Sequence, residues 1–388
     1  MRVGFYFGEI QPPNYGGGFT FQDSVLQQIL KHEMNHEIFI LYKGEGHHFV
    51  DTKNIKFVKL ENNDSKKEKK GLFGLKKKKK SNVIKQTPIQ KAIAENNIDL
   101  MYSLHIVRED FNIPYITTVW DLAHRKTPYF PEVSTVGWTF EMRENNYGPL
   151  LPKASGIVIG NNEGKRQVAH YYNIEPELIH TNPMPTPNYV YTTNEDNSIL
   201  AKNNLEKGKY FFYPAQFWAH KNHIVLLKAI KKLKEQGKDF KLALTGSDQG
   251  NMDFIKRKIS EMGLDNEVKL LGFVSREQIV ALYKNAYALT FASYMGPDNI
   301  PPLEAFALNC PVICADTYGM KEQLKNGALF FNPKSEDDLI AKILELDNQK
   351  ENLLENGYKL AKEYSIENYV NKIYQIIDDF QPIIDCWR

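Results

Sequence analysis

The sequence is poor in several features that each mark a class of protein. Its 388 residues include only three cysteines, too few for a disulfide framework and without the spacing of a metal site. No apolar run approaches the ~20 residues that cross a bilayer, and the N-terminal run is too short and too β-prone for a signal peptide. No Asp-x-Asp pair occurs, which argues against a metal held by paired aspartates. These absences predict a cytoplasmic protein that uses no metal and no cofactor.

Positive charge is concentrated in one segment. The chain has a net charge of +2, with an ordinary 42% of hydrophobic and 25% of charged residues. The segment Lys66–Lys80 holds nine lysines against Glu68, a net charge of +8, so the remaining residues together carry −6. A chain that is acidic outside one segment lacks the extended basic surface of a nucleic-acid binder, and we expect no nucleic acid among its partners.

The lysine-rich segment has two interpretations. Leu72, Phe73 and Leu75 lie between its two blocks of lysine. Basic residues beside exposed apolar ones bind anionic lipid surfaces, at about 1 kcal/mol per lysine near the surface. The same composition is typical of a solvated insertion whose like charges repel each other. The sequence leaves both open: a peripheral contact with the inner face of a membrane, or an insertion without a partner.

Strand-like and helix-like patterns alternate in two series along the chain. Such alternation predicts parallel sheets covered by helices on both faces, and the length suits two domains with a core each. The first series of predicted strands is Arg2–Phe7, Glu37–Tyr42, Ile55–Leu60, Leu100–Leu104, Tyr115–Trp120 and Gly156–Gly160, with helices at Thr20–Met34 and Val83–Ala94. The second is Tyr210–Phe217, Lys241–Thr245, Val268–Leu271, Ala286–Phe291, Pro311–Ala315 and Ala328–Phe331, with helices at His223–Glu235, Asp253–Met262 and Arg276–Asn285.

Composition also divides the chain into parts. Residues 1–185 are predicted to form the first domain and residues 209–365 the second. Residues 186–208 follow spaced prolines and contain the polar tract Thr192–Ser198, which is typical of a linker. Helical patterns continue to the C-terminus, where residues 366–388 are predicted to form the last helix.

The most informative stretch follows the apolar run Ala286–Phe291. Pro301 and Pro302 fit the first turn of a helix, because a missing N–H costs nothing there. Glu304 therefore falls about one turn inside a helix that begins beyond the carboxyl end of a strand, the edge where open α/β sheets bind ligands. A carboxylate near a helix N-terminus is also explained by the helix dipole alone. The pattern does not decide between the two.

The segment from Gly296 to Ile313 resembles the donor-site segment of the glycosyltransferase group 1 family (family 4). The resemblance implies donor contacts at Asn299, Ile300 and Glu304, with Glu304 accepting hydrogen bonds from the ribose hydroxyls of a nucleotide-sugar. The family carries a further glutamate eight positions earlier, where this chain has Gly296. Only half of that two-glutamate signature is therefore present.

The same resemblance implies the architecture and the substrates. Members of the family are retaining enzymes of the GT-B fold, an α/β architecture of two Rossmann-like domains with parallel sheets and a cleft between them. The last helix of this fold returns to the first domain, which we expect of residues 366–388. The implied donor is a nucleoside diphosphate sugar, and the implied acceptor is a saccharide or a lipid-linked saccharide.

Two motifs are implied to contact the donor diphosphate. Glycines after the first strand let backbone N–H groups approach an anion at a helix N-terminus, although a plain turn explains the run equally well. The position of this run matches the glycine loop of the family, which implies a role for Gly17 and Gly18. In the second half the family has Arg and Lys five positions apart, where this chain has Gln216 and Lys221. The retained lysine is expected to neutralise the leaving diphosphate.

Two later loops are implied to surround the nucleotide. Gly246 follows one predicted strand, and Phe273 and Val274 follow the next. By resemblance, the backbone at Phe273 and Val274 faces the base. Without the family, these are ordinary strand-to-loop positions.

On the acceptor side, the family often has His-Asp-Leu at the end of a strand of the first domain. This chain has Trp120 at the histidine position, keeps Asp121, and has His124 a few residues further on. Either Asp121 or His124 could orient a hydroxyl of the acceptor or of the sugar. A lone histidine is equally often a packed residue.

We therefore predict a retaining, metal-independent glycosyltransferase that moves a sugar from a nucleoside diphosphate to an acceptor hydroxyl. Gly296 and Gln216 depart from the family pattern. For that reason a non-catalytic nucleotide-sugar-binding protein on the same fold is the alternative. A nucleotide-sugar epimerase is a third, more distant interpretation.

Overall fold

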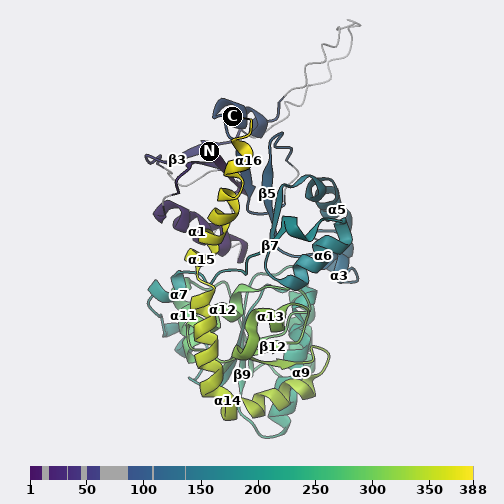
Figure 1. Ribbon diagram of the computed structural model, residues 1–388. Coiled ribbons are helices and arrows are strands. Elements are labelled where there is room, and N and C mark those ends of the chain that lie inside the picture. Colours follow the sequence, from purple (N-terminus) through teal and green to yellow (C-terminus); the bar gives the residue numbers. More distant parts are fainter. Residues whose placement is uncertain are drawn as a thin grey trace, which may run out of the picture.

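The computed structural model describes residues 1–10, 17–32, 34–44, 50–61, 86–106, 109–135 and 137–387. These residues form two α/β domains, which lie one above the other in Figure 1. The lysine-rich segment Lys66–Lys80 lies outside the described residues, as does most of the run before Gly17. Among the described residues, no helix is both long enough and apolar enough to cross a bilayer.

The N-terminal domain is built on a seven-stranded parallel sheet in the order β3-β2-β1-β4-β5-β6-β7. Its strands are β1 (Arg2–Glu9), β2 (Glu37–Lys43), β3 (Ile55–Lys59), β4 (Leu100–Ser103), β5 (Tyr115–Val119), β6 (Gly156–Ile159) and β7 (Ile179–Thr181). Its helices are α1 (Gly17–Lys31), α2 (Pro88–Glu95), α3 (Ala123–Lys126), α4 (Pro131–Ser134), α5 (Phe140–Leu150) and α6 (Asn162–Tyr172).

The C-terminal domain repeats the same plan on a six-stranded parallel sheet in the order β10-β9-β8-β11-β12-β13. Its strands are β8 (Tyr210–Pro214), β9 (Lys241–Thr245), β10 (Val268–Gly272), β11 (Ala288–Phe291), β12 (Val312–Ala315) and β13 (Ala328–Phe331). Its helices are α7 (Tyr189–Thr192), α8 (Ser198–Lys202), α9 (His223–Glu235), α10 (Met252–Glu261), α11 (Arg276–Asn285), α12 (Ile300–Ala307), α13 (Met320–Leu324) and α14 (Glu336–Glu363).

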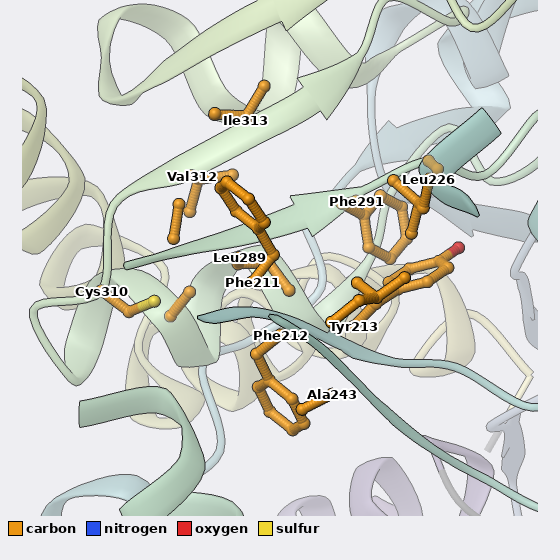
Figure 2. Close-up of a cluster of buried hydrophobic side chains, with 14 of the residues drawn as sticks. Phe211, Phe212, Tyr213, Leu226, Ala243, Leu289, Phe291, Cys310, Val312 and Ile313 are labelled. Atoms are coloured by element: carbon orange, nitrogen blue, oxygen red, sulfur yellow. The ribbon is translucent and has the colours of Figure 1, made fainter. Parts of the chain in front are cut away.

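Aromatic and β-branched side chains of the central strands make the core of the C-terminal domain. Figure 2 shows side chains of β8, β11 and β12 gathered in one cluster, including Phe211, Phe291 and Ile313. These three side chains are at most 1% exposed. The strands are therefore rigid supports, and the loops after their carboxyl ends are held in place by a buried core.

The chain crosses between the domains twice, at one place. Thr186 N–H donates to Tyr364 O over 2.7 Å, so the two crossing segments run side by side. After the second crossing, α15 (Ile366–Asp378) and α16 (Gln381–Ile384) lie beside the N-terminal domain (Figure 1). Tyr369 and Ile373 of α15 pack in the same buried cluster as Val25 of α1. The C-terminal helices thus complete the N-terminal core.

Residues 186–208 differ from the predicted linker. They contain α7 and α8, and Val190, Ile199 and Leu205 are buried in the core cluster of the C-terminal domain. The polar residues of this segment lie on its exposed face. The segment contains few apolar residues, so its composition alone does not reveal that one face packs against the C-terminal core.

The predicted fold class is confirmed, and every predicted strand is present within a few residues of its expected bounds. Strand β7 and helices α5 and α6 were not predicted. Strand β7 is only three residues long and contains His180, and α5 is polar on nearly all sides with only Tyr147 buried. Elements with so little apolar periodicity give almost no sequence signal.

Candidate functional site

The carboxyl ends of the two sheets face each other across the domain interface. Asn161, which follows β6, donates from its side-chain amide to the carbonyl of Pro297, which follows β11. Met184 N–H donates to Asp298 Oδ2 over 2.6 Å. Ligands of open parallel sheets bind at this edge, so the loops that meet here form the candidate site.

Glu304 lies at the centre of this edge on α12. The helix begins after Asn299, and its prolines occupy the first turn as predicted. The Glu304 side chain accepts a hydrogen bond from Tyr189 Oη on one oxygen and from Tyr283 Oη on the other, each at 2.8 Å. Burial raises the pKa of Glu304 despite these two donors. Each carboxylate oxygen has two lone pairs, so both can still accept a bond from a ligand hydroxyl.

The loop before α12 explains why glycine stands at position 296. Gly296 has a φ of +105°, and a Cβ there would lie 2.6 Å from Asn299 Oδ1. The Asn299 side-chain amide donates to Gly296 O over 2.8 Å. Ile300, the first residue of the helix, packs against the core of the N-terminal domain. A glutamate at 296 would have to displace Asn299, so this loop is built differently from one that carries the two-glutamate signature.

Lys221 lies at the end of the short helix Ala219–Lys221 after β8. Burial lowers its pKa to about 8, although the carboxylates of Asp121 and Glu132 act in the opposite direction. The ammonium lies 5.6 Å from the centroid of the Phe291 ring. Among the described residues it donates no hydrogen bond and forms no ion pair, so a half-buried cation is available to an anion.

Gln216 occupies the loop between β8 and Lys221. Its amide nitrogen donates to Ser247 Oγ over 3.2 Å, and its oxygen accepts from Trp218 Nε1 over 3.1 Å. The amide is therefore engaged on both sides and carries no charge. It holds the loop in place where the family pattern has a cation.

The remaining donor-side residues line the same edge with different exposures. Gly246 has a φ of +138°, and a Cβ there would lie 2.5 Å from Ala215 O, so only glycine fits. The Phe273 side chain is 70% exposed, whereas Val274 is buried. Gly17 and Gly18 are the first residues of α1. The donor roles of all these residues stay predictions.

The acceptor-side pair Asp121 and His124 belongs to an ion-pair network. Arg143 donates to both oxygens of Asp121, over 2.7 and 3.1 Å. Although burial opposes ionisation, this guanidinium lowers the pKa of Asp121 to about 2. Its side chain keeps 22% exposure, so a contact with the acceptor stays a prediction.

His124 lies enclosed in the same network. Its side chain is 0% exposed, and Nε2 lies 2.6 Å from Glu144 Oε1. Burial and the neighbouring Arg143 lower the pKa of His124 to about 4 despite that carboxylate. The enclosed ring belongs to the network that positions Asp121, and a contact of His124 with the acceptor stays a prediction.

Sequence reasoning missed Glu132, Tyr189 and Tyr283. Glu132 of α4 is 2% exposed and accepts from His220 N–H over 2.9 Å and from His220 Nδ1, which joins the domains next to Lys221. The two tyrosines hold Glu304. None lies in a motif, and only the tertiary structure brings them to the site.

Two facing parallel sheets with this connectivity define a protein of the GT-B fold. Within it, residues 195–363 match the model of the family Glycosyl transferases group 1. The resemblance found in the sequence is thereby confirmed for the C-terminal half, which contains Gln216, Lys221 and Glu304.

Two glycosyltransferases of known sequence are similar to part of this chain. The O-antigen chain mannosyltransferase RfbU of Salmonella typhimurium is 30% identical over 172 residues, which cover 44% of this chain and 45% of the relative. O-antigen chain mannosyltransferase B of Escherichia coli is 26% identical over 174 residues, 44% of this chain and 46% of the relative. The matched stretch therefore spans about half the length of these relatives.

Solved structures share the fold over the whole chain. Sucrose-phosphate synthase from Thermosynechococcus elongatus has a TM-score of 0.69 at 14% identity, covering 98% of both chains. Anabaena HepE in complex with UDP-glucose has a TM-score of 0.67 at 14% identity, covering 98% of this chain and 100% of HepE. At such identities the likeness concerns the fold alone.

Proposed function

We propose that this protein is a glycosyltransferase that moves a hexose from a nucleoside diphosphate to a hydroxyl of a saccharide or lipid-linked saccharide, with retention of configuration. The observation that carries the proposal is Glu304. It is a carboxylate held between two tyrosine hydroxyls at the carboxyl edge of a parallel sheet, inside the stretch that matches the family. The O-antigen mannosyltransferases among the relatives favour a glycan acceptor in polysaccharide synthesis.

The charge of the leaving diphosphate would be met chiefly by Lys221. An ammonium with no ion-pair partner among the described residues can turn toward phosphate oxygens without first breaking another bond. Removal from water makes such a charge more effective than a surface lysine, because the local dielectric is low. Backbone N–H groups at the start of α1 would also stabilise the charge of the diphosphate, and this mechanism would need no metal.

The altered positions support one alternative, a non-catalytic protein that binds nucleotide-sugars. Gln216 supplies no charge, and Gly296 supplies no carboxylate. If these losses abolish turnover, the protein would still bind a donor through Glu304 and Lys221. An epimerase would use the same donor with no acceptor.

The first experiment separates these functions and tests Glu304. Purified protein is assayed with a panel of UDP- and GDP-linked hexoses for transfer, hydrolysis and epimerisation, and binding of UDP and GDP is measured by calorimetry. Glu304→Ala should weaken nucleotide binding by about 10- to 100-fold, as expected when hydrogen bonds to a charged group are lost. Glu304→Gln is the matched variant, since it keeps the size and one acceptor oxygen.

Circular dichroism and thermal melting show whether each variant is folded. A folded Glu304→Ala protein with unchanged affinity for both nucleoside diphosphates would contradict the ribose role. Binding without transfer, hydrolysis or epimerisation of any donor would favour the non-catalytic alternative.

A further inference from the structure

The sheet of the N-terminal domain has a second feature that favours a ligand. Its strand order reverses between β1 and β4, because β2 and β3 lie on one side of β1 and β5 to β7 lie beyond β4. In open parallel sheets the crevice at such a switch point, outside the carboxyl ends of the strands, is where ligands bind. The residues at this point are Gly8 at the end of β1 and His105 just after β4.

The main chain at His105 is held by two side chains. Trp120 Nε1 donates to Leu104 O over 3.0 Å, and Ser103 Oγ donates to His105 O over 2.6 Å. Two consecutive main-chain carbonyls, those of Leu104 and His105, are thus fixed by side chains from β4 and from the end of β5. A side chain that binds a ligand must be held in one place by its neighbours, and these two hydrogen bonds hold the main chain of His105.

The His105 ring itself is closely surrounded on one side. It lies 5.9 Å from the Trp120 ring, centroid to centroid. A Cβ on Gly8, which has a φ of +69°, would come within 2.9 Å of Cε1 and 3.0 Å of Nε2. Glycine at position 8 is therefore what leaves room for the Nε2 edge of the imidazole.

The protonation of the ring follows from its surroundings. Nδ1 is buried and has no hydrogen-bond partner among the described residues. Burial lowers the pKa of His105 to about 4, so the imidazole is neutral at pH 7. A proton on Nδ1 would leave a buried N–H group without an acceptor. The neutral ring therefore carries its one proton on Nε2. The half-buried side chain then offers Nε2–H as a donor at the switch point.

Three other polar side chains that the structure describes at the carboxyl ends of β4 and β5 are already engaged. Ser103 is bonded to His105 O, Trp120 to Leu104 O, and Asp121 to Arg143. Trp120 and Ile300, the first residue of α12, pack against the same core cluster. His105 therefore lies on the side of the N-terminal sheet that meets the donor segment.

We propose that His105 is a sugar-binding residue of the active site, whose Nε2–H donates a hydrogen bond to a hydroxyl oxygen of a hexose bound at the β1–β4 switch point. The inference rests on the proposed glycosyltransferase function and deepens it. Trp120 supports the ring and supplies an apolar wall, and Gly8 leaves the space. The hexose is either the one carried by the donor or that of the acceptor, and the experiment separates these sources.

The test compares His105→Ala and His105→Gln with wild type. The glutamine amide can reach the region of Nε2 and donate, whereas alanine cannot. Loss of one hydrogen bond predicts a fall in kcat/KM of about tenfold or more for alanine, with partial recovery for glutamine. His170→Ala is the matched control, since His170 is exposed on α6 of the same domain.

Calorimetry with UDP-glucose and UDP, and with GDP-mannose and GDP, separates the two sources. If His105 binds the donor hexose, His105→Ala loses affinity for the nucleotide-sugar but binds the nucleoside diphosphate as wild type does. If it binds the acceptor, donor affinity is unchanged and the KM for acceptor rises about tenfold. A folded His105→Ala protein with wild-type donor affinity and wild-type transfer kinetics overturns the inference.

A merely structural role is distinguished by the glutamine variant. If alanine and glutamine lower activity and melting temperature equally, the ring is packing rather than binding, and the inference also fails. Failure of the proposed function is different: wild type would show no turnover, and Glu304→Ala would leave nucleotide binding unchanged.

Discussion

Single side chains at the site derive their chemistry from neighbours that are distant in sequence. Tyr189 and Tyr283 come from α7 and α11 and direct their hydroxyls at Glu304. Arg143 fixes Asp121, and His124 is enclosed behind it. The residue type at each position was visible in the sequence, but the partners that decide its role were not.

At the residue scale, Lys221 gives a prediction about pH. Its pKa of about 8 lies below the ordinary value of 10.5 because of burial, so the ammonium loses its proton as the pH rises through 8. We expect kcat/KM, which reports the free enzyme, to fall above pH 8. Lys221→Ala should lower kcat by roughly 10²-fold, as for other groups that stabilise a leaving anion, and should remove this alkaline limb.

The measurement is a pH–rate profile from pH 6 to 9.5 for wild type and Lys221→Ala. Lys228→Ala on the exposed side of α9 is the control. If the variant changes only KM, the lysine assists binding but not departure of the diphosphate.

At the element scale, the loop before α12 is a unit whose residues depend on one another. Gly296, Asn299 and Gln323 interlock: Asn299 binds the Gly296 carbonyl, and Asn299 N–H donates to Gln323 Oε1 over 3.0 Å. A single residue of the family signature therefore cannot be restored alone.

Gly296→Glu should weaken donor binding and lower the melting temperature, even though it restores the second glutamate of the family. The left-handed φ costs a non-glycine residue about 1–2 kcal/mol, and the new Cβ would displace Asn299. Gly237→Ala is the control for strain alone, since Gly237 has a φ of +72° with nothing within 4 Å of a Cβ. A Gly296→Glu protein with higher transferase activity than wild type would refute this account.

The raised pKa of Asp298, which lies at the junction of the two domains, leads to a prediction of how stability depends on pH. Burial, helped by Glu322, raises its pKa from 3.8 to about 7, although Met184 N–H and Asn299 N–H oppose this. Tyr364 and Tyr369 also face it. The folded protein prefers the protonated carboxyl, so the stability from this group is fully present below about pH 4 and is lost as the pH rises through 7.

Asp298→Asn should remove this loss. The difference in the free energy of unfolding between the variant and wild type should therefore shift in favour of the variant from pH 5 to pH 8, as measured by urea denaturation. Asp253→Asn, at an exposed position of α10, is the control. A difference that stays constant over this range would mean that Asp298 does not titrate there.

At the scale of the whole molecule, the charge of Lys66–Lys80 leads to a prediction about membrane binding that does not depend on the donor site. Nine lysines around Leu72, Phe73 and Leu75 should bind anionic vesicles, and the binding should weaken as salt shortens the Debye length below ~10 Å. Deleting the segment should abolish co-sedimentation with anionic liposomes and leave nucleotide binding unchanged. Equal sedimentation of deleted and intact protein would leave the segment as a solvated insertion.

The sequence by itself determined the two series of strands and helices, because buried parallel strands read as short apolar runs and their periodicity is local. Pro301 and Pro302 also placed Glu304 near the start of a helix beyond a strand, whereas Lys221 was singled out only by the resemblance to the family. Elements with little apolar periodicity, such as β7 and α5, were missed for the same reason.

Only the tertiary structure decided what surrounds each candidate. It enclosed His124, engaged Gln216 with Ser247 and Trp218, and brought residues 189–205 into the C-terminal core. It also set His105 beside Gly8 at the switch point of a sheet. Burial and pairing between distant segments fix charge and access, and no local pattern in a chain encodes which distant segments will meet.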